Sequence, residues 1–231
     1  MIKKCWLLVV GLLVCSCLGA NAITLQFDGF IADEANLISP QNENDINMML
    51  WDLKKKTGSD IAVVTMNSLN GRDVNSVAIE IGREYKLGDK NKNNGIVFLT
   101  APNERIMSIQ LGYGLEKSLG KSTAEQVRDY DVLPYYKQNR YEEGIFRGAY
   151  ALARAVASSE NVSVKSYGNV PARISNSSSH RNSDNIPWWA YPFAIIMAII
   201  SPRRRGRFSS SGFSGFGGGG GFGGCGCSGR W

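Results

Sequence analysis

Two short apolar runs, Asp60 to Met66 and Ile96 to Leu99, constrain the fold of this chain more than any other feature. Both runs are continuous rather than alternating, and the first is rich in β-branched residues. A strand that is apolar on both faces needs helices on both sides of its sheet. The sequence therefore predicts a buried β-sheet between layers of helices.

Amphipathic helices are expected beside these strands. Ser39 and Pro40 predict the start of the first helix, through a capping hydroxyl followed by proline, and Gly58 predicts its end. Strands interleaved with such helices indicate a mixed α/β fold, and we expect a single three-layer α/β/α sandwich over residues 28–159. The other expected elements are a helix from Asp73 to Tyr85, a strand from Arg105 to Leu111, a flexible turn at Gly112-Tyr113-Gly114, and helices at Thr123–Tyr130 and Glu142–Ser158.

The charge distribution argues against nucleic acid as a partner. The whole chain carries a formal charge of +6, but residues 23–170 hold 17 Lys and Arg against 19 Asp and Glu, a net charge of −2. The basic surplus lies at Lys3 and Lys4 and in seven arginines from Arg173 onward. Binding to a phosphate backbone needs cations clustered on a folded surface, which this distribution does not predict.

The N-terminus has the pattern of a signal peptide. Lys3 and Lys4 precede an apolar stretch from Cys5 to Leu18, and Ala20-Asn21-Ala22 supplies the small residues of a cleavage site. We expect residues 1–22 to be removed by cleavage after Ala22. The alternative is a lipoprotein processed before Cys17.

A second apolar segment, residues 186–201, is interpreted as a transmembrane segment that follows a flexible linker at 160–185. Its aromatic residues suit one membrane interface, and the arginines after it suit the cytoplasmic side. This arrangement places the domain on the extracytoplasmic side of the cell membrane and a disordered basic and Gly-rich tail, 202–231, in the cytoplasm. An interfacial helix or a hydrophobic plug is the alternative for the segment. The single histidine, His180, falls in the linker.

The cysteines lie only at the two ends of the chain, and none occurs between Ile23 and Ser211. Residues 28–159 are therefore expected to fold without disulfides. Without Cys or His they also have no Ser/His/Asp or Cys/His catalytic set. Two thiols, Cys225 and Cys227, are too few for a closed zinc site, and we expect a reduced pair.

Several motifs in this order resemble the TPM-domain family. The matching stretches are Ile31 to Ser39, Asn93-Asn94-Gly95 before a strand, Gly112-Tyr113-Gly114-Leu115-Glu116, and Asn139-Arg140-Tyr141 with Gly144 and Gly148. The signal peptide, membrane segment and Gly-rich tail resemble its bacterial branch. The resemblance implies an exported α/β/α domain, to which acid phosphatase activity and calcium binding have been attributed through acidic residues at the end of the sheet.

By this resemblance the candidate metal ligands are Asp33, Asn94 and Glu116, with Asp89 as a weaker candidate, and calcium is the metal they would bind. The chain departs from the family pattern at Asn93 and at Lys121, where the family has aspartates. Each candidate also has a structural interpretation, because Asp33 can cap a turn, Asn94-Gly95 is ordinary turn chemistry and Glu116 can be solvated.

Three functions follow from these observations, and the third and least favoured is an envelope anchor that acts through the C-terminal tail. The first is a membrane-tethered accessory module that assembles or stabilises membrane or envelope protein complexes, and the loss of two acidic positions favours it over catalysis. The alternative is an exported, metal-dependent acid phosphatase acting on phosphomonoesters, which rests on the family resemblance.

Overall fold

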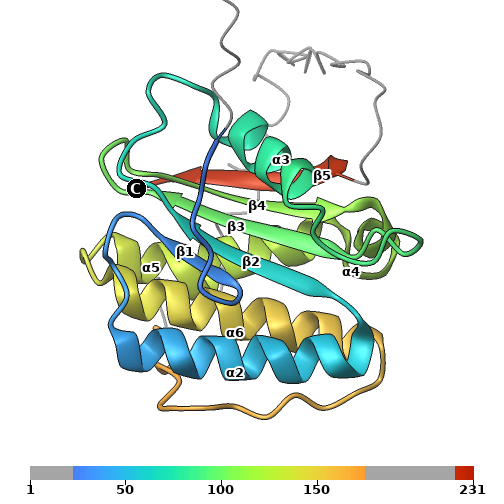
Figure 1. Ribbon diagram of the computed structural model, residues 1–231. Helices are drawn as coiled ribbons and strands as arrows, with labels where there is room; N and C mark the ends of the chain where they lie inside the picture. The colour runs from blue at the N-terminus through green and yellow to red at the C-terminus, as the bar shows by residue number, and fades with distance from the viewer. Residues whose placement is uncertain (1–22, 175–221) are drawn as a thin grey trace, which may run out of the picture.

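A five-stranded sheet runs through the centre of the computed structural model, which describes residues 23–174 and 222–231 (Figure 1). The strands follow one another in the order β1-β2-β3-β4-β5. The first three are parallel, whereas β4 is antiparallel to β3 and β5 is antiparallel to β4. Their bounds are β1 (Ile31–Asp33), β2 (Asp60–Thr65), β3 (Gly95–Ala101), β4 (Ile106–Gly112) and β5 (Phe222–Arg230).

The helices begin and end mostly where the sequence predicts. Gly58 ends α2 in the left-handed conformation (φ 74°), and Asp73 caps α3 by accepting a 2.9 Å bond from the Ser76 N–H. Ser39 precedes α2 as predicted, but its hydroxyl makes no capping bond. The bounds are α2 (Pro40–Thr57), α3 (Val74–Glu84), α4 (Tyr113–Gln126), the π-helix η1 (Val127–Val132), α5 (Leu133–Tyr136) and α6 (Tyr141–Ser159).

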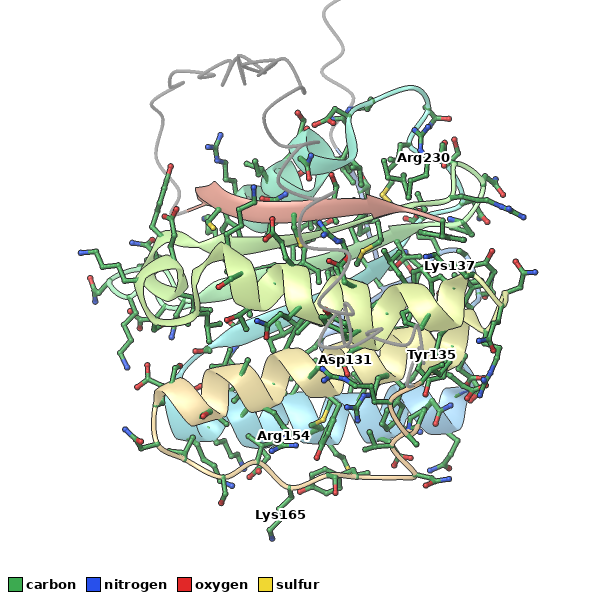
Figure 2. All side chains as sticks on the ribbon, turned by 180° about the vertical axis from the view of Figure 1, so that it is seen from behind. Asp131, Tyr135, Lys137, Arg154, Lys165 and Arg230 are labelled. Atoms are coloured by element: carbon green, nitrogen blue, oxygen red, sulfur yellow. The ribbon has the colours of Figure 1, made fainter. Side chains whose placement is uncertain are left out.

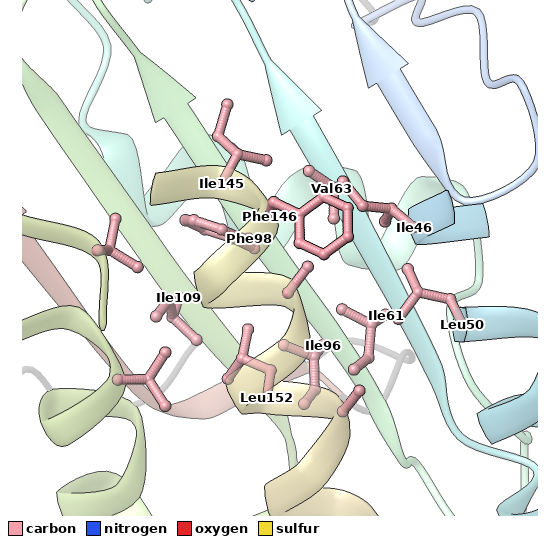
Figure 3. Packing of buried hydrophobic residues seen from close by; sticks show 14 of the residues in the cluster. Ile46, Leu50, Ile61, Val63, Ile96, Phe98, Ile109, Ile145, Phe146 and Leu152 are labelled. Atoms are coloured by element: carbon pink, nitrogen blue, oxygen red, sulfur yellow. The ribbon is translucent and has the colours of Figure 1, made fainter. Parts of the chain in front are cut away.

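Helices cover both faces of the sheet, so the predicted mixed α/β domain is confirmed. On one face α3 packs on β2 and β3 through Val77 and Ile81, whereas α2 and α6 lie on the opposite face (Figure 1). Figure 3 shows Ile46 and Leu50 of α2 and Phe146 of α6 against the side chains of the three central strands. Every residue of β2 and β3 is buried, as the two continuous apolar runs predict.

The segment from Tyr113 to Tyr136 differs from the prediction. The expected turn at Gly112-Tyr113-Gly114 is instead the start of α4, which is interrupted at Gly120 (φ 68°). The expected helix at Thr123–Tyr130 is split between the end of α4 and η1. Glycine at position 120 permits this left-handed break, which amphipathic periodicity alone does not predict.

The C-terminal residues are not a disordered tail, which corrects the prediction for residues 222–231. These residues form β5, which pairs with β4 along most of its length. Phe222 is 2% exposed and its ring packs on Gly82 and Gly95, where a Cβ atom would lie 2.7 Å from it. Within β5 a Cβ atom on Gly226 would lie 1.9 Å from the side-chain oxygen of Gln110, so this glycine reflects close packing rather than disorder.

This pairing has a consequence for membrane topology. A strand that shares a sheet with β4 lies on the same side of any membrane as the domain. A single span with the domain outside and residues 222–231 in the cytoplasm is incompatible with β5. The predicted signal peptide (1–22) and membrane segment (186–201) lie outside the described residues. Within 23–174 and 222–231, no helix combines the length and apolar character needed to cross a membrane.

The packed unit is wider than residues 28–159. At its start Ile23 and Leu25 are buried, and the Leu25 N–H donates a 2.7 Å bond to the Tyr85 hydroxyl. At its end the chain after α6 lies along the helices as far as Ile174, which packs on the core. The described part of the predicted linker, 160–174, lacks regular secondary structure but is anchored to the domain.

Candidate functional site

Asp33, the first candidate ligand, lies at the end of β1 and holds the turn that leads to α2. Its carboxylate accepts 3.1 and 2.9 Å bonds from the backbone N–H groups of Leu37 and Ile38, and the hydroxyl of Thr65 also donates to it. These bonds fix the chain between β1 and α2. The interpretation of Asp33 as a turn cap is confirmed.

Asn94 and Asp89 organise the loop before β3. The side chain of Asn94 is buried, and its amide accepts a 2.8 Å bond from the Asp89 N–H and donates a 3.1 Å bond to Ser59. The carboxylate of Asp89 accepts bonds from the N–H groups of Asn91 and Lys92, which lower its pKa. The side chains of Asn94 and Asp89 therefore make hydrogen bonds within their own loop and to Ser59.

The two glycines of the Gly112-Tyr113-Gly114 motif let the loop before β3 come close to the end of β4. The Gly114 N–H donates a 3.0 Å bond to the carbonyl of Asn93. A Cβ atom on Gly114 would lie 1.7 Å from the carbonyl oxygen of Lys92, and one on Gly112 would lie 2.2 Å from that of Asn93. The motif is explained by backbone packing, because only glycine allows such contacts.

Glu116 follows in the first turn of α4 and is partly exposed. Its charge acts on Cys225 of β5, whose pKa is raised first by burial and then by Glu116. Lys121, where the family has an acid, lies 3.6 Å from Glu125 in an exposed ion pair. Neither Glu116 nor Lys121 makes a contact that points to a metal.

The four candidates lie at two opposite edges of the sheet. Asp33 is in register with Thr65 at the carboxyl end of β2, whereas Gly95, next to Asn94, is in register with Asp60 at the amino end. Five residues of strand separate these ends, or about 17 Å. A calcium ion needs its oxygen ligands within about 2.6 Å, so Asp33 cannot share a site with the other three. Across the described ranges no three His, Cys, Asp or Glu residues are arranged to hold a metal.

A cluster that the sequence analysis missed lies where η1 meets α6. Asp131, 1% exposed, accepts a 2.8 Å bond from Arg147 Nε and 3.1 and 2.5 Å bonds from Nε and Nη2 of Arg173. The signal in the sequence is weak: Asp131 falls four residues after Val127 and directly before Val132, two apolar residues that are buried with it in η1. We call the space around these side chains and Arg154 the arginine pocket.

An exposed apolar patch lies on the outer side of α2. Met48 and Trp51, one turn apart, are 46% and 52% exposed. The Lys55 ammonium lies 5.1 Å from the centre of the Trp51 ring, and the Phe30 ring lies 6.5 Å from it. Exposed large hydrophobic side chains that cluster in this way are typical of protein contact sites.

Comparison with known proteins identifies the family of this fold. The model of the TPM domain, whose label is TPM phosphatase, matches residues 31–155. No curated protein is similar enough to count as a match.

Several solved structures resemble the chain, and two of them illustrate the likeness. The N-terminal domain of a protein from P. gingivalis has a TM-score of 0.54 and 23% identity, over 61% of this chain and 88% of that one. The BA42 protein from the psychrophilic bacterium Bizionia argentinensis has a TM-score of 0.47 and 19% identity, over 53% and 83% of the two chains. At these identities the first likeness supports the fold alone. The matched family segment ends before β5, which lies outside it.

Proposed function

The chain belongs to the TPM domain family, and we propose that it is an extracytoplasmic, membrane-associated module that assembles or stabilises membrane or envelope protein complexes. The observation that carries this proposal is the patch of Met48 and Trp51 on α2. Tryptophan and arginine dominate the binding energy of protein interfaces, and a solvated Trp51 gains by losing water to a partner.

The geometry of the patch suits a protein partner. Trp51 supplies a large flat apolar surface, and the nearby ammonium of Lys55 adds a polar rim. The α2 helix is held rigidly by Ile46, Met49, Leu50 and Leu53, which are buried in the core. A partner therefore meets a preformed surface and does not have to order it.

The membrane association rests on the apolar segment at 186–201. A domain held close to a bilayer meets membrane partners at a raised effective concentration. With the signal peptide at 1–22, the domain would lie on the extracytoplasmic side. In this proposal residues 222–231 stay on the same side as the domain, because they belong to its sheet.

The alternative, a metal-dependent acid phosphatase, receives less support from the geometry. Metal-assisted hydrolysis of a phosphomonoester needs a cation held by converging ligands next to the substrate. Asp33 bonds within its own turn, and Asn94 bonds to Asp89 and Ser59 at the other edge of the sheet. These positions favour binding over catalysis.

A double variant tests the binding module. Met48→Ala with Trp51→Ala removes the patch while leaving the buried face of α2 intact, so the melting temperature should stay near that of the wild type. The amount of protein that co-migrates with native membrane complexes should fall at least about tenfold, the loss expected for a central aromatic contact. Tyr113→Ala, an equally exposed aromatic residue on α4, is the matched control. Unchanged co-migration of the double variant would refute the proposal.

A further inference from the structure

The arginine pocket lies on the side of the domain formed by α4, η1 and α6, where Figure 2 shows Asp131 and Arg154. It has a volume of about 270 Å³, and its lining includes Gln126, Asp131, Arg147, Tyr150, Arg154 and Arg173. Three separate segments of the chain supply these residues. Arg147 and Arg154 come from α6, and Arg173 comes from the segment after it, so the guanidinium groups are not a run of charges along one helix.

Asp131 positions two of the guanidinium groups. Its buried carboxylate accepts bonds from Arg147 and Arg173, and Arg147 also donates a 3.4 Å bond to the carbonyl of Pro171. A guanidinium has five N–H donors, so both arginines keep donors beyond those that bond to Asp131. The carboxylate lies on η1, and π-helical turns of this kind occur frequently at functional sites.

Arg154 adds a third positive group. Its guanidinium lies 5.8 Å from the centre of the Tyr150 ring, and that of Arg147 lies 5.7 Å from the same ring. In the part of the chain that the structure describes, no carboxylate lies within 4.0 Å of Arg154. Three arginines and one aspartate line the pocket, which leaves a local charge of +2.

This excess of positive charge determines which kind of ligand the pocket can bind. A phosphate group carries a charge of about −1.5 to −2 at neutral pH and offers several acceptor oxygens. Arginine binds such groups through paired N–H bonds, and guanidinium groups already positioned by Asp131 and Tyr150 lose little freedom on binding. The side-chain amide of Gln126 provides a neutral donor at the same site.

We propose that the arginine pocket is a binding site for a phosphate group, carried by a small phosphorylated molecule or by a phospholipid headgroup. The site lies apart from the α2 patch and goes beyond the proposed function, because it takes an anionic ligand rather than a protein surface. Arg147 and Arg173 hold the group from the side of Asp131, and Arg154 closes on it from the exposed side.

Calorimetry on the full chain tests this site. Inorganic phosphate and phenyl phosphate are titrated at constant ionic strength, and vesicles of phosphatidylcholine with and without phosphatidic acid form the lipid arm. Saturable binding of either phosphate ion identifies a soluble ligand, and binding only to vesicles with phosphatidic acid identifies a headgroup. Both results support the site, provided that Arg154→Ala weakens binding at least about tenfold, as loss of a charge-assisted bond predicts.

Two controls keep the test specific. Lys165→Ala removes the same charge from the segment after α6, away from the pocket (Figure 2), and should bind like the wild type. Trp51→Ala should also bind phosphate normally, so that failure of this site and failure of the α2 patch are distinguishable. No binding to any of the probes, or binding that Arg154→Ala leaves unchanged, would overturn the proposal.

Discussion

The turn after β1 and the arginine pocket each contain a carboxylate that accepts three hydrogen bonds, but the donors differ. Two of the three donors to Asp33 are backbone N–H groups four and five residues further along the chain. The donors to Asp131 are guanidinium groups 16 and 42 residues away, and Asp131 is almost completely buried. The first carboxylate shapes the local backbone, whereas the second joins separate segments and leaves positive charge facing a pocket. An acidic residue in a recognisable motif is therefore not by itself a sign of a ligand site.

The largest effect on stability is expected at an apolar contact between residues that are far apart in the sequence. Phe222→Ala should destabilise the protein by about 3 kcal/mol, because it empties the space over Gly82 and Gly95 and weakens the docking of β5. Chemical denaturation of the full chain measures the change. Ser228→Ala, which removes only a 3.4 Å contact to Asn75 from the same strand, should change stability by less than about 0.5 kcal/mol. Equal effects would mean that β5 is not anchored by Phe222.

The arginine pocket should show the next largest effect. Asp131→Asn leaves two guanidinium groups without their carboxylate and should lower the free energy of unfolding by about 2 kcal/mol. This is less than the loss for a fully buried ion pair, because Arg173 is 53% exposed. Asp129→Asn in the same helix removes an exposed carboxylate and should cost less than about 1 kcal/mol. Denaturation curves of the two variants decide the comparison. A milder effect at Asp131 than at Asp129 would contradict the role given to Asp131.

The turn after β1 should respond less. Asp33→Asn keeps one acceptor oxygen but turns an amide N–H₂ toward the donors, so a loss of about 1.5 kcal/mol is expected. Thr65→Val removes the hydroxyl that donates to the same carboxylate. In a double-mutant cycle the two changes should be less than additive, because they break one shared bond. Full additivity would show that the bond contributes nothing to stability.

Part of this comparison was predictable from the sequence. The apolar runs of β2 and β3, the α3 cap at Asp73 and the α2 end at Gly58 were predicted because each depends on residues close together in the chain. The same is true of Asp33 as a turn cap. The π-helical turn and the break at Gly120 depend on how that segment packs against its neighbours, so periodicity did not predict them.

The arginine pocket and β5 could not be predicted, because each depends on residues that are far apart in the sequence. The arginines that meet Asp131 lie in α6 and in the segment expected to be a linker, and no local pattern joins them. The glycine content of β5 matches that of unstructured chains, and it therefore predicts a disordered tail. Its packing depends on Gly82 and Gly95, about 130 residues earlier, where small residues leave room for Phe222.

The smallest effect on stability is expected from Glu142, a partly exposed carboxylate whose hydrogen-bond partners are far away in the sequence. Burial raises the pKa of Glu142, but hydrogen bonds from Ser39 and Asn42 outweigh it and lower the pKa overall. A lowered pKa stabilises the fold above the unfolded value of about 4.3, and this contribution is lost as the pH falls through the folded pKa. Glu142→Gln should therefore flatten the loss of stability below about pH 4.3, whereas Glu160→Gln at the other end of α6 should not. Identical pH profiles for the wild type and Glu142→Gln would show that exposure cancels the effect.

Titration of the full chain with calcium, followed by calorimetry, tests most directly whether the acidic motif residues hold turns or a metal. We predict no saturable heat up to millimolar calcium, because Asp33 lies at the opposite edge of the sheet from Asn94, Asp89 and Glu116. Saturable calcium binding that is lost in Asp33→Asn would contradict this account and would restore these residues as a metal site.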